Sequence, residues 1–309
     1  MIFGKLFLLY SLIGLGFIGQ KKIPIRPETF SNILLKYILP VFVFCKLATS
    51  HLDLSSINKI ILTLATALIV CLLCLSLSGK IWRKEKDNNL GKLMAAAIPN
   101  GNTGYFGIPI ALIFFSPALS AQYILANFGI TFFQLTIGYY LYAQSQASLN
   151  KSLQKLFLFP AFWAFMAGMF MSNQLSLLPL SFHDTLFKIA EVSGLIFSVG
   201  GMMLIGIGLA GLKMNDLCWK TILWSGFFCF IIWPLAALSV IFIDQSFFHW
   251  LKEDEYKILL LMALCPIGAN AVIYATHFDL YPKKAALMVF SSTVIALPVI
   301  ALGSFFLLS

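Results

Sequence analysis

Charged residues are scarce in this chain. Asp, Glu, Lys and Arg make up 11% of its 309 residues, whereas a soluble domain carries about 25%. Long polar loops are lacking too, which leaves no room for a soluble domain between the apolar runs. Hydrophobic residues make up 60% of the chain, and the mean hydropathy is +0.91. This composition predicts an all-α polytopic membrane protein.

Signatures of enzymes are missing as well. The sequence has no G-x-S-x-G, H-E-x-x-H, phosphate-binding loop or dinucleotide fingerprint, and its clear acids lie in loops or at segment ends. The six cysteines lack metal-ligand spacing, since Cys71 and Cys74 form a C-x-x-C without a second pair or a His. We therefore expect no enzyme, no metal and no cofactor, and we interpret the cysteines as apolar packing residues.

Ten apolar segments follow one another, each near the ~20 residues that span a bilayer as a helix. They cover residues 2–19, 29–50, 58–79, 92–116, 119–143, 155–171, 186–212, 218–243, 256–278 and 284–308. The first is interpreted as a spanning helix and not a signal peptide, because it lacks a small-residue cleavage site and Lys21 and Lys22 follow it directly.

The basic residues indicate the orientation. If loops alternate sides, one side collects 14 of the 21 Lys and Arg residues. These are Lys21, Lys22, Arg26, Lys80, Arg83, Lys84, Lys86, Lys92, Lys151, Lys155, Lys213, Lys220, Lys283 and Lys284. The positive-inside rule makes this side cytoplasmic and places both termini at the periplasmic or extracellular face, and the short loops favour a bacterial inner membrane. The net charge of +9 then reflects topology and contacts with membrane lipids, not nucleic acid.

The ten segments divide into two halves of five. Residues 1–143 form the first predicted repeat, 144–154 a short cytoplasmic linker and 155–309 the second repeat. Because each half has an odd number of spans, the halves lie in opposite orientations, and if they are repeats they are inverted repeats.

Two apolar segments are interrupted. The fourth contains residues 99–109 (PNGNTGYFGIP), and the ninth contains 265–270 (CPIGAN). Hydrocarbon offers no hydrogen bonds, so a broken helix is tolerated only against protein or a water-filled cavity. Breaks at matching positions of two halves indicate the binding site of a secondary transporter. The alternative is that these Pro and Gly residues only kink the helices for packing.

The residues of the two breaks suit a carboxylate. Free N–H groups at a helix start attract anions, and Asn amides donate to them without the desolvation cost of a buried Lys. If the breaks cross at the midplane, Asn102 and Asn270 face one small polar site from opposite directions. The predicted substrate contacts are Asn100, Asn102, Thr103, Gly104, Pro109, Pro266, Gly268 and Asn270.

Glu191 and His277 are candidates for ion coupling. Glu191 opens the seventh segment three residues after Lys188, so it forms either an interfacial ion pair or a proton or cation site. His277 follows the second break and is either a loop residue or proton-linked. Lys36 either snorkels to the cytoplasmic face or attracts anions to an inner vestibule.

The two breaks also resemble a known family. Residues 102–109 (NTGYFGIP) resemble the N-T-x-x-x-G-I-P stretch in the fourth helix of the auxin efflux carrier family, which includes plant PIN-type carriers and bacterial malonate and malate permeases. Residues 266–268 (PIG), 275–282 (ATHFDLYP) and 296–300 (ALPVI) resemble its ninth and tenth helices. Gly101 stands where the plant carriers have Pro, and the long regulatory loop of many plant members is reduced to about a dozen residues.

The resemblance implies inverted five-helix repeats with crossing broken helices 4 and 9. It also implies a transport domain of helices 3–5 and 8–10 that moves against a scaffold of helices 1, 2, 6 and 7, often in a homodimer. We expect a carrier of small organic anions, mono- or dicarboxylates, that works by alternating access. The alternatives are a sodium- or proton-coupled symporter of the bile-acid-symporter type and a non-transporting membrane ligand sensor.

Overall fold

The computed structural model describes residues 2–23, 26–50, 54–81, 88–145, 149–172, 174, 179–210 and 218–308. All regular elements in these ranges are helices. They are α1 (Ile2–Lys22), α2 (Pro27–Ile33), η1 (Leu34–Ile38), α3 (Leu39–Ala48), α4 (Leu54–Ile81), α5 (Asn88–Ala97), η3 (Thr103–Gly107), α6 (Ile108–Phe114), α7 (Pro117–Phe133), η4 (Gln134–Gly138), α8 (Tyr139–Ala143), α9 (Leu149–Phe157), α10 (Pro160–Ser172), α11 (Leu180–Ala210), α12 (Trp219–Phe227), η7 (Phe228–Ile232), α13 (Trp233–Ile243), η8 (Asp244–Phe248), η9 (Glu253–Glu255), α14 (Tyr256–Ala263), α15 (Asn270–His277) and α16 (Pro282–Leu308).

Six helices of the described residues are long and apolar enough to cross a membrane, and a seventh span is formed if the bent pair α9–α10 counts as one. The bend between α9 and α10 is 51°. The fourth and ninth predicted segments are helical but broken, so the helices on either side of each break are too short to span a membrane alone. The first predicted segment is helical as α1. These helices make the chain an integral membrane protein, while the ten-span inverted repeat remains a prediction.

Several predicted boundaries differ from the structure. The first interruption is shorter than 99–109, because helix resumes at Thr103 as a π-helical turn and Pro109 lies at the start of α6, where its missing N–H is harmless. Pro40 likewise lies in the first turn of α3, inside one continuous span. Residues 146–148 of the predicted linker and 211–212 of the seventh segment lie outside the described residues.

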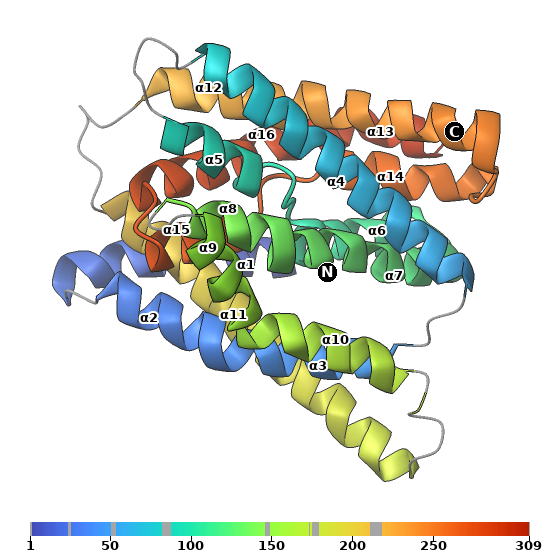
Figure 1. Ribbon diagram of the computed structural model, residues 1–309, viewed down its shortest axis with the longest axis horizontal. Helices are drawn as coiled ribbons and strands as arrows, with labels where there is room; N and C mark the ends of the chain where they lie inside the picture. The colour runs from blue at the N-terminus through green and yellow to red at the C-terminus, as the bar shows by residue number, and fades with distance from the viewer. Residues whose placement is uncertain are drawn as a thin grey trace.

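The helices pack into two groups (Figure 1). The small helix group consists of α1, α2–η1–α3, α10 and α11, and the large helix group consists of α4 to α8 and α12 to α16. In Figure 1 the group of α2, α3 and α10 lies at the bottom, and α12, α13 and α16 lie at the top. The groups meet where α11 packs on α15 and α16, where α2 packs on α15, and where Phe165 of α10 lies against Phe132 of α7.

Glycine allows close packing within the small helix group. A Cβ at Gly16 of α1 would overlap the carbonyl oxygen of Met203 on α11, and a Cβ at Gly206 would overlap the carbonyl oxygen of Ile13. Small residues let helix backbones approach in this way. The van der Waals packing that results stabilises helix pairs in lipid, where the hydrophobic effect does not drive helices together. The reciprocal contact fixes α1 along α11.

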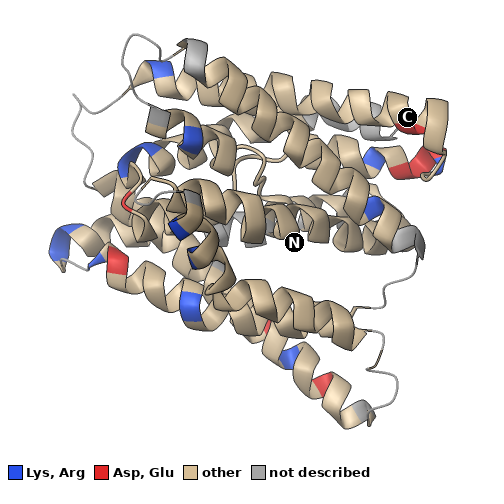
Figure 2. Ribbon diagram, viewed as in Figure 1, with Lys and Arg blue, Asp and Glu red and all other residues tan. Residues whose placement is uncertain are grey.

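Charged residues gather at the ends of the helices (Figure 2). In this view most of the ribbon between the two ends is tan, whereas Lys and Arg mark the left end of the molecule and an acidic turn marks part of the right end. Four of the basic residues that predict the cytoplasmic side, Arg83, Lys84, Lys86 and Lys213, lie outside the described residues. A bare middle between two charged ends is the pattern that a bilayer imposes.

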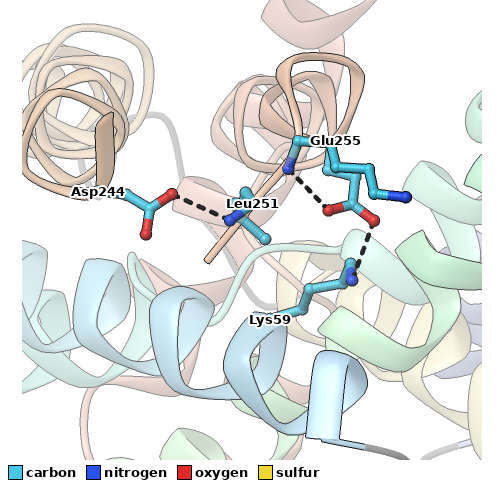
Figure 3. A network of polar contacts seen from close by, with 5 residues as sticks. Lys59, Asp244, Leu251 and Glu255 are labelled. Carbon is cyan, nitrogen blue, oxygen red and sulfur yellow. Dashed lines mark hydrogen bonds and ion pairs between the residues drawn. The ribbon is translucent and has the colours of Figure 1, made fainter. Parts of the chain in front are cut away.

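Two carboxylates, of which Asp244 is buried, order the turn between α13 and α14 (Figure 3). Asp244 is fully buried and accepts hydrogen bonds of 3.1 Å from the Trp250 and Leu251 N–H groups and from the Tyr256 hydroxyl. Glu255 forms a 3.0 Å ion pair with Lys59 of α4, whose side chain is 1% exposed. These contacts link the α13–α14 turn to α4 within the large helix group.

We expect Asp244→Asn to lower the melting temperature of the detergent-purified protein. The Asn side chain has one acceptor oxygen in place of two, and its NH2 group would face one of the groups that now donate to Asp244. Each buried donor left without an acceptor costs about 1–3 kcal/mol. The matched control is Asp254→Asn, because Asp254 is 84% exposed and pairs with Lys257 only at 3.9 Å; its effect should stay within about 0.5 kcal/mol. Equal melting temperatures for the two variants would contradict a structural role of Asp244.

Candidate functional site

The two breaks cross and pair through their backbones. Gly101 and Ile267 form an isolated antiparallel β-bridge. The Asn102 N–H donates to the Pro266 carbonyl at 2.6 Å, and the Gly268 N–H donates to the Asn100 carbonyl at 2.9 Å. Each break therefore satisfies part of the backbone that the other leaves unpaired, as broken helices inside a membrane require.

Side chains from four further elements complete this pairing. The Trp233 indole of α13 donates to the Ile98 carbonyl at 3.1 Å, and the Tyr123 hydroxyl of α7 donates to the Thr103 carbonyl at 3.1 Å. The remaining two contacts join the Ile267 N–H to Ser292 Oγ at 3.1 Å and Cys229 Sγ to the Cys265 carbonyl at 3.6 Å. The crossing is thus built into the large helix group from several sides.

Asn100 and Asn270 join their side chains at this crossing. Asn270 Nδ2 donates to Asn100 Oδ1 at 3.4 Å. Asn100 is 1% exposed, and its Nδ2 has no hydrogen-bond partner among the described residues. Asn270 Oδ1 is a second buried atom without one. A buried amide atom without a partner costs free energy, so these two atoms mark a place where a ligand can bind.

Gln134 is a site residue that the sequence analysis did not single out. It begins η4, is 7% exposed, and accepts a 2.7 Å hydrogen bond from Asn270 Nδ2 at its Oε1. Its Nε2 donates to the Tyr274 hydroxyl at 3.2 Å. The available signal was an amide inside the apolar fifth segment, which it shares with Gln122 and Asn127, because polar groups at membrane depth mark functional sites.

The other predicted contacts lie around this pair. Asn102 is 7% and Thr103 1% exposed, and the Thr103 hydroxyl forms a short hydrogen bond with Asn127 Oδ1 of α7. Gly104 follows Thr103 in η3, near Asn127, and Pro266 and Gly268 are buried in the second break. Pro109 lies farther along, in α6. Seven of the eight predicted contacts thus lie at the breaks or in the turn that follows the first.

The two candidate coupling residues lie away from the crossing. Glu191 does not open its helix, because α11 begins at Leu180, and it is exposed on the fourth turn, within electrostatic range of Lys46. No ion pair joins it to Lys188 in the described part of the chain. His277 is the last residue of α15, about 10 Å along the helix from Asn270. Its half-buried ring contacts Phe278, and its Nδ1 lacks a described hydrogen-bond partner.

The polar groups at the crossing are neutral. Among the residues that the structure describes, no charged side chain forms a hydrogen bond or ion pair with Asn100, Asn102 or Asn270. No group of three or more His, Cys, Asp or Glu residues in the described ranges is placed to hold a metal ion. The polar groups present at the crossing are therefore amides, hydroxyls and backbone groups.

We expect Gly268→Ala to loosen the crossing. Its Cβ would overlap Asn270 Oδ1 and lie 2.9 Å from the Asn100 carbonyl oxygen, which Gly268 itself binds. The melting temperature should fall by the equivalent of about 1–3 kcal/mol. In the control Gly226→Ala the Cβ meets only Ile295 Cδ1 at 3.9 Å, so its higher helix propensity should hold or raise stability. A shift of the same sign and size in both variants would refute the close approach.

Comparison with known proteins assigns a general class. No protein-family model matches the chain. It is 25% identical over 293 residues to an "uncharacterized transporter" of Methanocaldococcus jannaschii, covering 91% of this chain and 90% of that protein. It is 24% identical over 300 residues to an "uncharacterized transporter" of Methanothermobacter thermautotrophicus, covering 96% and 92%. With its apolar helices, this distant homology makes the chain a polytopic membrane transporter, which argues against an enzyme.

Proposed function

We propose that the protein is a secondary transporter of small organic acids, mono- or dicarboxylates, and a member of the auxin efflux carrier family. The observation that carries this proposal is the backbone-paired crossing of two broken helices, with two buried amide atoms left without partners. A carboxyl group is small and polar enough for a site made of two Asn amides and helix-start N–H groups.

The packing of the helices supports alternating access. The large helix group holds both breaks, while the small helix group contacts it through α11 and α2. Gly201 of α11 faces the second break, since a Cβ there would meet Ala269 Cβ at 3.3 Å and Ile273 Cδ1 at 3.4 Å. A Cβ at Gly208 would meet Ala286 Cβ of α16 at 2.8 Å. Glycines at these contacts of α11 leave few side chains to interlock there, so we propose that the large helix group moves along α11 and carries the crossing with it.

We propose a ten-span membrane topology for the protein. Ten spans arranged as inverted repeats 1–143 and 155–309, in a bacterial inner membrane, place both termini outside and the linker 144–154 in the cytoplasm. The fourth and ninth segments, which correspond by position in the two halves, then enter the membrane from opposite sides. This orientation agrees with the antiparallel bridge between their breaks.

Reporter fusions test this topology. Alkaline phosphatase is active only outside the cytoplasm, and green fluorescent protein exported through the general secretion route stays dark. We expect phosphatase activity for fusions at either terminus and fluorescence for an insertion in the linker 144–154. If the N-terminal fusion shows phosphatase activity, fluorescence from the C-terminal fusion would refute the ten-span arrangement. The two termini would then lie on opposite sides, which requires an odd number of spans.

Flux measurements test the transport function. We would reconstitute the protein in liposomes and measure protein-dependent, saturable uptake of labelled malonate, malate and an aromatic acid, with and without an imposed voltage or proton or sodium gradient. We expect uptake of at least one acid. Saturable binding without flux would favour a ligand sensor, and uptake only with a sodium gradient would favour a cation-coupled symporter.

Asn102→Ala should lower this uptake at least tenfold, because one lost hydrogen bond of about 1.4 kcal/mol changes an equilibrium by that factor. The control is Asn150→Ala on α9, whose side chain is exposed. Unchanged uptake by a folded Asn102→Ala protein would remove Asn102 from the site.

A further inference from the structure

The amides of Asn100 and Asn270 form only half of the pairing available to them. Two facing carboxamides can form two N–H···O bonds in a closed pair, since each has a donor and an acceptor. Here one bond is formed, from Asn270 Nδ2 to Asn100 Oδ1 at 3.4 Å, while Asn100 Nδ2 and Asn270 Oδ1 stay buried and without partners in the described structure. The pair is held open on one side.

Gln134 keeps the pair open. Its 2.7 Å bond to Asn270 Nδ2 is shorter than the 3.4 Å bond to Asn100, so Gln134 determines where the Asn270 amide points. Gln134 is itself fixed by its 3.2 Å bond to Tyr274, a fully buried side chain four residues beyond Asn270 on α15. Gln134 is thus a positioning residue for Asn270.

The donor and acceptor left over do not depend on how the amides are assigned. Oxygen and nitrogen of an amide are told apart only by their hydrogen bonds. Reversing Asn270 alone would set its oxygen against both Gln134 Oε1 and Asn100 Oδ1, so the three amides reverse together or not at all. Reversed together, with the Tyr274 hydroxyl as donor, they still leave one N–H and one carbonyl oxygen free at the crossing.

We propose that this pair binds a neutral carboxylic acid group, not a carboxylate, and that a primary carboxamide fits in its place. A carboxylic acid accepts at its carbonyl and donates from its hydroxyl, which matches one free N–H and one free carbonyl oxygen. A carboxylate only accepts, so it would face a carbonyl oxygen with no buried cation beside it, which is costly. This inference rests on the proposed function and specifies the form of the acid that is bound.

The proposal makes transport proton-linked without a titrating side chain. The acid takes up its proton in water on the side of entry, crosses with its O–H donating to an Asn, and loses the proton in water on the side of exit. A carboxyl group with a pKa of about 4 is neutral in about one molecule in 1,000 at pH 7. At a fixed, low total concentration, binding should therefore weaken about tenfold for each unit that the pH rises above the pKa of that group.

Matched ligands of one charge and similar size provide the test. Malonamate carries one carboxylate and one carboxamide, and monomethyl malonate carries one carboxylate and one ester, which accepts but cannot donate. We would measure their binding and that of malonate to the purified protein by calorimetry between pH 6 and 8. We expect malonamate to bind with an affinity independent of pH, malonate to weaken about tenfold per pH unit above its second pKa, and monomethyl malonate to bind at least tenfold more weakly than malonamate.

Gln134→Leu tests the positioning. Without the 2.7 Å bond, Asn270 is free to close on Asn100, so the preference for malonamate over the half ester should fall toward one. Gln122→Leu is the control, because Gln122 lies on α7 about three turns earlier and should keep the preference. A preference that Gln134→Leu leaves intact would overturn this role.

The outcomes separate this inference from the proposed function. Equal binding of malonamate and the half ester, with a malonate affinity that is flat from pH 6 to 8, would overturn the inference even if the flux assay shows transport. Selective binding of malonamate without flux of any acid would support the inference and overturn transport. Failure of all three ligands to bind a folded protein would overturn the inference, and flux of another acid would still stand.

Discussion

The structure depends on backbone hydrogen bonds at two places where helices break inside an apolar chain. Each unpaired N–H or carbonyl there would cost several kcal/mol in hydrocarbon. The two breaks satisfy part of these backbone groups by pairing with each other at the Gly101–Ile267 bridge. Trp233, Tyr123, Ser292 and Cys229 supply the remaining partners from helices that surround the crossing. The large helix group is consequently organised around this one feature.

The pairing of the two breaks also explains the chemistry of the candidate site. A crossing of this kind leaves little space, and Gly268 meets the Asn100 carbonyl so closely that only glycine fits. The polar groups that remain are amides, which can be both donor and acceptor. Asn100, Asn270 and Gln134 form one connected set in which each amide limits the orientation of the next. Such a set is suited to distinguish ligands by their hydrogen-bonding pattern as well as by charge.

The two helix groups are held together differently. Within the small helix group, Gly16 and Gly206 let α1 and α11 approach closely, and each contacts the backbone of the other. Within the large helix group, the ion pair between the buried Lys59 and Glu255 ties the turn between α13 and α14 to α4, and the Asp244 carboxylate orders that turn. Between the groups, α11 presents Gly201 and Gly208 to α15 and α16. Tight contacts inside each group and small residues between them favour motion of one group against the other.

The amino-acid sequence was sufficient to predict the class of the protein. Apolar runs and scarce charge predicted a membrane protein with helical spans, and Pro and Gly clusters located both breaks, because these residues oppose helix wherever they gather. It also included Asn100 and Asn270 among the predicted contacts, but it set Asn102 opposite Asn270, whereas in the structure Asn270 binds Asn100.

Which groups meet is seen in the three-dimensional arrangement of the helices. The true end of the first break at Asn102, the start of α11 eleven residues before Glu191, and the bond from Gln134 to Asn270 all depend on contacts between segments far apart in the chain. Sequence spacing reports the neighbours of a residue along one helix. It does not report which helix lies opposite, and the hydrogen bonds of a buried amide are determined by that opposite helix.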